Sequence, residues 1–135
     1  MAAPQLTQSI LVVEDDPSIA ELIAWALDDA GFAVRSAASV AEALRLCDQA
    51  TPDLVVVDFL LPDGLGSDLI CALRQRCLAR VRAVVISAHP RAAELARSID
   101  ADACLRKPFD LDDFFSTVER LLLPVNAPPT GMLTD

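Results

Sequence analysis

The chain has little positive charge and no long apolar run. Lys and Arg number 11 against 20 Asp and Glu, which gives a net charge of −9 over 135 residues. Such an acidic chain repels the phosphates of nucleic acids and of anionic membranes. Hydrophobic residues make up 53% of the chain, but no stretch approaches the roughly 20 residues of a membrane-spanning helix. Residues 1–8 lack the regions of a signal peptide. We therefore expect a cytoplasmic protein that binds neither nucleic acid nor membrane directly.

The cysteines lack the spacing of a metal site or a disulfide framework. Cys47, Cys71, Cys77 and Cys104 form no C-x-x-C pair, and the only histidine, His89, is distant from all four in sequence. A chain of this length can bury a core without such cross-links. We interpret the four cysteines as small core hydrophobes.

The rest of the sequence is organised around residues 51–66. Leu54–Val57 is an apolar, mostly β-branched run bounded by Pro52 and by Pro62 and Gly64, which is typical of a strand buried on both faces of a parallel sheet. The run ends on Asp58. In open parallel sheets the ligand crevice lies beyond the carboxyl ends of the strands. Taken alone, Asp58 is better explained as the start of a turn, so a functional role depends on which other residues accompany it.

Apolar periodicity predicts five strands that alternate with five helices. We expect strands at residues 9–13, 32–37, 54–58, 82–87 and 102–106. We expect helices after Asp16, after Ser39 with Glu42 as a capping box, from about Leu69 to Cys77, from Pro90 to Ile99, and from Leu111 to Leu122. This alternation predicts an α/β fold, a three-layer α/β/α sandwich around a parallel sheet. Residues 9–123 would form one domain, and the Pro-rich residues 124–135 a flexible tail or a cut linker.

Five polar residues follow the ends of four predicted strands and would share one edge of the sheet: Glu14, Asp15, Asp58, Ser87 and Lys107. Crowded carboxylates must be protonated or hold a cation, and hard oxygen ligands suit Mg²⁺. A lysine and a serine hydroxyl supply what a phosphoryl group needs as counter-charge and hydrogen-bond donor. Singly, each has a simpler explanation: acids that complement a helix dipole, a serine cap, or a solvated lysine.

With these residues assembled, the chain resembles the response-regulator receiver domains (CheY-like) of two-component signalling. The matching motifs are residues 11–17 (LVVEDDP), 53–64 (DLVVVDFLLPDG) and 107–109 (KPF), in the family's order. The resemblance covers about residues 10–123. It implies a flavodoxin-like five-stranded sheet in the order 2-1-3-4-5.

The resemblance also implies a role for each residue. Asp58 would take a phosphoryl group from a partner's phosphohistidine, and Lys107, before a cis peptide bond to Pro108, would contact a phosphoryl oxygen. Ser87 would hydrogen-bond the phosphoryl group and move towards it. Mg²⁺ would bind Asp15, Asp58 and the backbone carbonyl of Leu60, and Glu14 would act mainly through a bound water. The protein would be no enzyme in the ordinary sense, but a signal receiver that promotes its own phosphorylation and dephosphorylation.

One position departs from the family's pattern, and two others bear on the loss of the phosphoryl group. Cys104 stands where relatives usually carry the Tyr or Phe of an aromatic switch, which predicts a quieter or differently routed switch. Leu60 and His89 occupy positions that relatives use to tune loss of the phosphoryl group. An apolar Leu60 cannot position an attacking water, so we expect a long-lived phospho-aspartate.

Other classes of function stay open at this point. A haloacid-dehalogenase-type phosphatase or phosphotransferase also uses a strand-end Asp with Mg²⁺, but it needs a second acid where this chain has Leu60. A flavin carrier would need a phosphate loop where the chain has Glu14 and Asp15. A receiver-like binding module that signals without phosphorylation is a third alternative.

The expected partners follow from the resemblance to receiver domains. They are a sensor histidine kinase or a histidine phosphotransfer protein, and an effector protein or a second copy of the chain as a phosphorylation-dependent homodimer. The sequence fits a stand-alone receiver and an excised one equally well.

Overall fold

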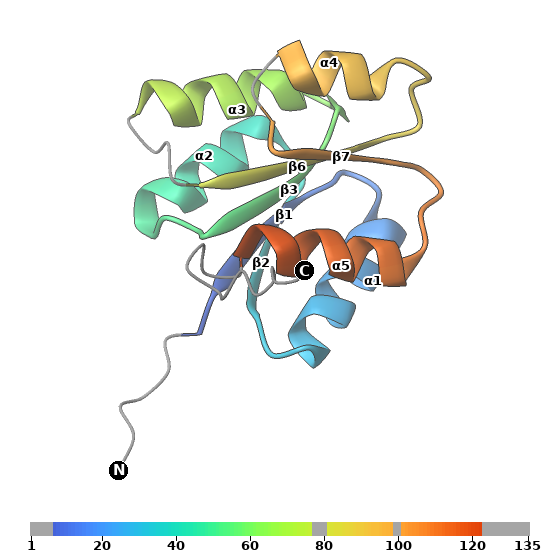
Figure 1. Ribbon diagram of the computed structural model, residues 1–135. Helices are drawn as coiled ribbons and strands as arrows, with labels where there is room; N and C mark the ends of the chain where they lie inside the picture. The colour runs from blue at the N-terminus through green and yellow to red at the C-terminus, as the bar shows by residue number, and fades with distance from the viewer. Residues whose placement is uncertain (1–6, 77–80, 99–100, 123–135) are drawn as a thin grey trace, which may run out of the picture.

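A parallel β-sheet forms the middle layer of the molecule (Figure 1). The computed structural model describes residues 7–76, 81–98 and 101–122. Its five-stranded sheet has the order β2-β1-β3-β6-β7. The strands are β1 (Ser9–Val13), β2 (Ala33–Ala37), β3 (Leu54–Asp58), β6 (Arg82–Ser87) and β7 (Ala103–Arg106). Counted within this sheet the order is 2-1-3-4-5, so the predicted topology is confirmed.

Helices cover both faces of the sheet. The helices α2 (Val40–Gln49), α3 (Gly66–Gln75) and α4 (Ala92–Ser98) lie above it in Figure 1, and α1 (Pro17–Asp29) and α5 (Leu111–Leu122) lie below. Alternate residues of a strand point to opposite faces. Leu11 and Val13 of β1 accordingly pack in the core under α2, α3 and α4, whereas Ile10 and Val12 pack against α1 and α5. The predicted α/β/α sandwich is confirmed.

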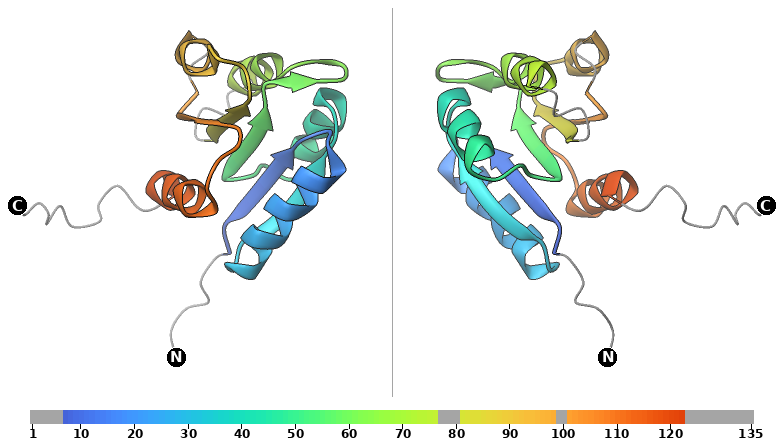
Figure 2. Two further views of the ribbon diagram at one scale, coloured as in Figure 1. Left: turned by 90° about the vertical axis from the view of Figure 1, so that its right-hand side faces the viewer. Right: turned by 90° about the vertical axis from the view of Figure 1, so that its left-hand side faces the viewer.

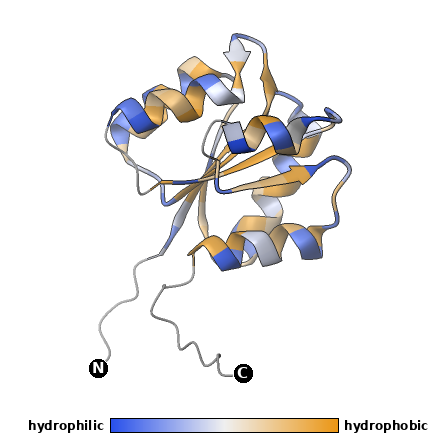
Figure 3. Cartoon of the chain, turned by 45° about the horizontal axis from the view of Figure 1, so that its top comes forward, coloured by the Kyte–Doolittle hydropathy of each residue, from blue (hydrophilic) through white to orange (hydrophobic). Residues whose placement is uncertain are grey.

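The central strand is buried on both faces, as its sequence predicts. Residues 54–57 are each 0% exposed. In Figure 3 the middle of the sheet is mostly orange, whereas the helices alternate between orange and blue. A strand with no polar side chain until its last residue leaves that residue, Asp58, as the first polar group at the carboxyl end.

A small hairpin follows β3 that the sequence pattern does not reveal. Strands β4 (Leu60–Leu61) and β5 (Gly64–Leu65) pair antiparallel, and Figure 2 shows them between β3 and α3. We expected only a glycine turn here. Strands of two residues are too short for a period-2 pattern to appear.

The helix caps are largely as predicted. Asp16 Oδ1 accepts hydrogen bonds from the Ser18 and Ile19 amides, and Pro17 opens α1. The capping box at α2 is half formed. Ser39 Oγ accepts from the Glu42 amide, but the Glu42 carboxylate accepts from the amide of Ala38 instead of Ser39.

The boundaries of four elements differ from the sequence prediction. Helix α3 begins three residues earlier than expected, at Gly66, because the Asp68 carboxylate accepts the Leu65 amide and so caps an earlier first turn. Strand β2 begins one residue later than expected, because the Phe32 amide bonds the Leu27 carbonyl at the end of α1. Strand β7 also begins one residue late, at Ala103, although the Asp102 amide donates to the Ala83 carbonyl at 2.8 Å. Helix α4 begins at Ala92, after a turn at Pro90.

The interpretation of all four cysteines as core residues is wrong in part. Cys47 is buried, Cys104 is half-buried in β7, and Cys71 is exposed on α3. Cys71 lies on the outer surface because its neighbours Leu69, Ile70 and Leu73 occupy the buried face of that helix. Cys77 and the expected tail at residues 124–135 lie outside the described residues, as does Ile99 at the expected end of α4.

Candidate functional site

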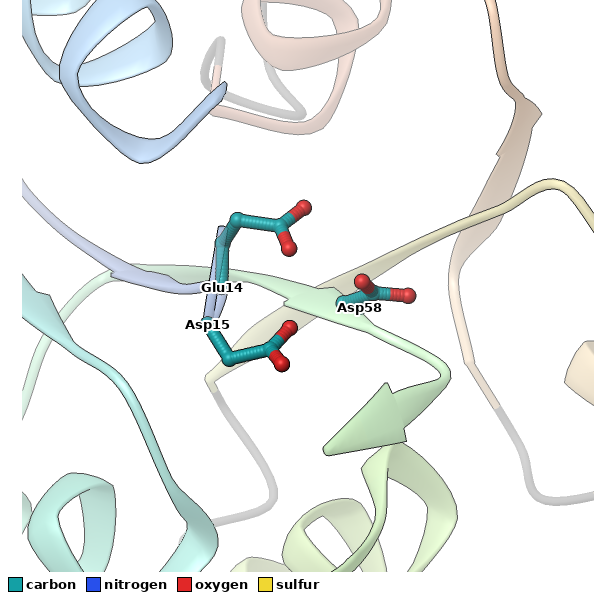
Figure 4. A group of neighbouring side chains, drawn as sticks. All are labelled: Glu14, Asp15 and Asp58. Atoms are coloured by element: carbon teal, nitrogen blue, oxygen red, sulfur yellow. The ribbon is translucent and has the colours of Figure 1, made fainter. Parts of the chain in front are cut away.

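Side chains from several strand ends meet at the carboxyl edge of the sheet. Glu14 and Asp15 directly follow β1, and Asp58 is the last residue of β3. Figure 4 shows the three carboxylates turned towards a common space. Each offers an oxygen within 4.8 Å of the others. The acids predicted from the sequence are thus brought together.

Lys107, which follows β7, joins two of these acids. Its Nζ donates to Glu14 Oε1 at 2.7 Å and to Asp58 Oδ2 at 3.0 Å. The bond between Lys107 and Pro108 is cis, as the family resemblance implies. The side chains of Glu14, Asp58 and Lys107 are only 1%, 13% and 19% exposed. The ammonium group therefore neutralises part of the charge that the crowded carboxylates would otherwise hold against one another.

Burial and this ion pair shift two of the pKa values. Burial raises the pKa of Glu14 above its usual value, the hydrogen bond from Lys107 opposes that rise, and the neighbouring Asp58 adds to it. Burial lowers the pKa of Lys107, but its hydrogen bonds to Glu14 and Asp58 outweigh this effect and hold the pKa above its ordinary value. Lys107 thus stays a cation at neutral pH.

Ser87 lies at the same edge but its hydroxyl faces another group. It ends β6 and is 2% exposed. Its carbonyl accepts the Lys107 amide at 2.9 Å, and its Oγ accepts the His89 amide at 2.9 Å. Among the described residues, no hydrogen bond joins Ser87 Oγ to Asp58 or Lys107. The bond from the His89 amide uses a lone pair of this oxygen and leaves the O–H as a donor.

Leu60 begins the hairpin next to Asp58. Its amide donates to Asp58 Oδ1 at 3.3 Å, and its residue surface is 57% exposed. Asp58 therefore has one oxygen directed to Lys107 and the other to the hairpin backbone. Whether the Leu60 carbonyl is a metal ligand stays a prediction.

The residues fit a Mg²⁺ ion by the chemistry of their donors. Three carboxylates supply hard oxygen atoms from two neighbouring strands, and Asp15 is exposed to solvent that can complete the coordination shell. No histidine or cysteine belongs to the group, so softer metals are disfavoured.

Sequence reasoning missed one residue that supports the site. Asp63, at the tip of the hairpin, accepts the amides of Val40 at 2.8 Å and Ala41 at 3.0 Å. These amides belong to the first turn of α2, 22 and 23 residues away in sequence. The Pro-Asp-Gly sequence signals a turn, but nothing in it indicates this distant partner.

Comparisons with known proteins agree with the fold and the site. The response regulator receiver domain family matches residues 10–119. The transcriptional regulatory protein KdpE of Mycobacterium tuberculosis is 34% identical over 109 residues, which cover 79% of this chain and 47% of KdpE. The chain thus spans about half the length of such relatives.

Solved structures give the same result. A response regulator from Chloroflexus aurantiacus is 30% identical, with a TM-score of 0.83 over 88% of this chain and 100% of that one. TrrA of Thermotoga maritima, solved in complex with Mg²⁺-BeF, is 28% identical, with a TM-score of 0.78 over 86% of this chain and 100% of that one.

The chain belongs to the response regulator receiver domain family. It is a phospho-acceptor module of two-component signalling, and its acidic group lies where receiver domains bind Mg²⁺. The haloacid-dehalogenase-type alternative is not favoured, because the position that would hold its second acid is the exposed Leu60. In the described part of the chain, no helix is long and apolar enough to span a membrane.

Proposed function

We propose that Asp58 is the phospho-acceptor of this receiver. The observation that carries the proposal is its place at the end of β3, among two further carboxylates and in contact with Lys107. In the reaction, a carboxylate oxygen of Asp58 forms a bond to phosphorus as the bond from phosphorus to the donor's histidine nitrogen breaks. The product is a mixed anhydride, an aspartyl phosphate.

The neighbouring residues have separate roles in this step. Lys107 offers a compact positive charge to an oxygen of the incoming phosphoryl group, and the hydrogen bond from its amide to the Ser87 carbonyl joins the ends of β6 and β7. The Ser87 hydroxyl would donate a hydrogen bond to the phosphoryl group once the side chain turns from its resting position.

Mg²⁺ belongs to the proposal as the cofactor. Asp15, Asp58 and the Leu60 carbonyl would hold it directly, and Glu14, already bonded to Lys107 and to the Asp16 amide, would act through a water molecule. When bound, the ion would supply positive charge that offsets the negative charge of the carboxylates and the phosphoryl oxygens.

The donor in this proposal is a phosphohistidine of a sensor histidine kinase or of a histidine phosphotransfer protein. The output would be binding to an effector protein or formation of a phosphorylation-dependent homodimer. Relatives such as KdpE are transcriptional regulators, and this chain spans only about half of their length, so an attached output domain is an alternative to a stand-alone receiver. A cytoplasmic location and a domain bounded at residues 9–123 stay predictions.

The proposal predicts a phosphorylation that needs both the acid and the metal. The chain would be incubated with acetyl phosphate with and without Mg²⁺, and its intact mass recorded beside that of an Asp58→Asn variant. We expect one phosphoryl adduct on the wild-type chain with Mg²⁺ and none on the variant. An adduct of equal yield on Asp58→Asn, or none on the folded wild-type chain with Mg²⁺, would contradict the proposal and favour a receiver-like module that signals without phosphorylation.

A further inference from the structure

The chain's only histidine lies in the loop after β6, the strand that ends on Ser87. His89 is exposed, and its ring makes a specific contact within the loop: Nδ1 accepts the Arg91 amide at 3.0 Å. The same residue's backbone amide donates to Ser87 Oγ at 2.9 Å. Two consecutive turns therefore run from Ser87 to His89 and from His89 to Arg91.

A second contact holds the ring against the phosphorylation site. The rings of His89 and Phe59 lie with centroids 6.4 Å apart and planes tilted by 53°. Phe59 directly follows Asp58, is 7% exposed, and donates its amide to the Ile86 carbonyl of β6. The imidazole thus contacts Phe59 on one side and the amide of Arg91, just before α4, on the other.

These contacts fix one hydrogen-bond partner of Ser87 Oγ. As long as the ring is held, the His89 amide stays in place and keeps its hydrogen bond to Ser87 Oγ. That bond uses a lone pair of the hydroxyl and leaves its O–H to donate, so Ser87 Oγ can move towards a phosphoryl group on Asp58 with the bond intact only if the loop moves with it; otherwise it gives up the amide. Movement of the loop costs more while the bond between Nδ1 and the Arg91 amide is intact.

We propose that His89 is a positioning residue that holds Ser87 in its resting arrangement. This inference rests on the proposed function, because the movement that His89 opposes is the turn of Ser87 towards phosphorylated Asp58. Loss of the ring's hydrogen bond should therefore favour the phosphorylated-like state, although the ring itself touches no reacting atom.

Three substitutions of His89 distinguish the effect of its hydrogen bond from the effect of its ring. Asn at position 89 keeps an acceptor atom at the same number of bonds from the backbone, and Asn side chains commonly accept the amide two residues on. Phe keeps an aromatic ring beside Phe59 but has no acceptor, and Ala has neither. His89→Asn should therefore behave as the wild type, and His89→Phe and His89→Ala should behave alike.

The probe is beryllofluoride with Mg²⁺, which imitates a phosphoryl group on a carboxylate. We expect His89→Ala and His89→Phe to bind it about threefold to tenfold more tightly than wild type, the range for one net hydrogen bond. In a Ser87→Ala background the same substitutions should have no effect. Unaltered or weaker binding in His89→Ala, no rescue by His89→Asn, or a gain that persists without Ser87 would each overturn the inference.

A measurement without the probe keeps the two proposals apart. Amide hydrogen exchange of Arg91 in the free protein should accelerate in His89→Ala and His89→Phe and stay at the wild-type rate in His89→Asn. Equal exchange in all four proteins would overturn the role of His89 whatever the chemistry at Asp58. Failure of the wild type to bind beryllofluoride, with exchange as expected, would instead contradict the proposed function and with it the coupling of this loop to phosphorylation.

Discussion

At the scale of single residues, the site depends on one cation among three acids. Lys107 is the chain's only lysine, and its ammonium lies within hydrogen-bond distance of both Glu14 and Asp58. Glu14 is nearly inaccessible to solvent. Removing the partner of a buried carboxylate costs far more folding free energy than removing the partner of an exposed one.

Lys107→Met should therefore lower the free energy of unfolding by about 1–3 kcal/mol, because Glu14 is left buried without a cation. Urea unfolding at neutral pH measures the loss. The matched control is the same substitution in a Glu14→Gln background, where the loss should shrink. Equal losses in the two backgrounds would show that the pair with Glu14 does not carry the effect.

A single residue, Leu60, should also set the lifetime of the phosphorylated state. Leu60 is exposed beside Asp58 and has no group that could orient a water molecule. We expect Leu60→Asn to shorten the lifetime of the aspartyl phosphate several-fold, as followed by the decay of the phosphorylated mass after the donor is removed. Leu60→Val is the apolar control. Identical decay of Leu60→Asn and wild type would contradict this explanation.

At the scale of elements, the hairpin of β4 and β5 joins the site to two helices. Asp63 at its tip caps α2, and the Asp68 carboxylate of α3 accepts the Leu65 amide at 2.8 Å. The hairpin also carries Leu60, whose amide reaches Asp58. The backbone next to Asp58 is thus held by contacts with α2 and α3.

The cap by Asp63 should make stability depend on pH in the acid range. Hydrogen bonds from the Ala41 and Val40 amides lower the pKa of Asp63 below its ordinary 3.8. A carboxylate whose pKa is lowered on folding stabilises the protein above its unfolded-state pKa, and this contribution is lost as the pH falls through the folded-state pKa. Asp63→Asn should therefore be less stable than wild type near pH 6, with the difference shrinking below pH 3.8.

Urea unfolding of both proteins at a series of pH values measures this difference. Asn keeps one acceptor oxygen but places an NH2 group, which cannot accept, against the second amide. The part of the difference that disappears on acidification therefore reports the charge of Asp63, and the part that does not change with pH reports the lost acceptor. A difference that stays constant down to the acid limit would show that the charge of Asp63 has no part in the cap.

The start of α3 packs closely against the end of β3. A Cβ on Gly66 would lie 2.5 Å from the carbonyl oxygen of Asp58 and 3.2 Å from the Cα of Phe59, so α3 begins where only glycine fits. Gly66→Ala should lower the free energy of unfolding by about 1–3 kcal/mol and reduce the yield of phosphorylation. Ser67→Ala, one residue on, is the matched control and should change stability by no more than about 0.5 kcal/mol. A Gly66→Ala variant as stable and as readily phosphorylated as this control would contradict the packing argument.

At the scale of the whole molecule, the strands and the edge where they end could be predicted from the sequence. The apolar run before Asp58 and the alternation of strands with helices allow few possible topologies for the sheet. Parallel strands need crossover connections, and their carboxyl ends share one edge. Motif resemblance then supplied the cis bond after Lys107. The surface position of Cys71 follows from the helical spacing of Leu69, Ile70 and Leu73, and it was missed because the cysteines were interpreted from composition alone.

Contacts between residues distant in the chain were beyond the sequence pattern. The cap of Asp63 on α2 and the hairpin that carries it depend on how the elements pack. Tertiary hydrogen bonds of this kind have no local signature. The bonds of His89 are local, because its ring accepts the amide of Arg91 two residues on and its own amide donates to Ser87 Oγ two residues back, but the sequence does not show which acceptor each amide uses.

The identity of the acceptor residue is the central claim, and reductive trapping tests it most directly. The chain would be phosphorylated with acetyl phosphate and Mg²⁺, treated with borohydride, which reduces an acyl phosphate to an alcohol, and mapped by peptide mass spectrometry. We predict homoserine at position 58 in the phosphorylated sample and unaltered aspartate there in a sample without the donor. Reduction at Glu14, Asp15 or another carboxyl group, with Asp58 intact, would contradict the account.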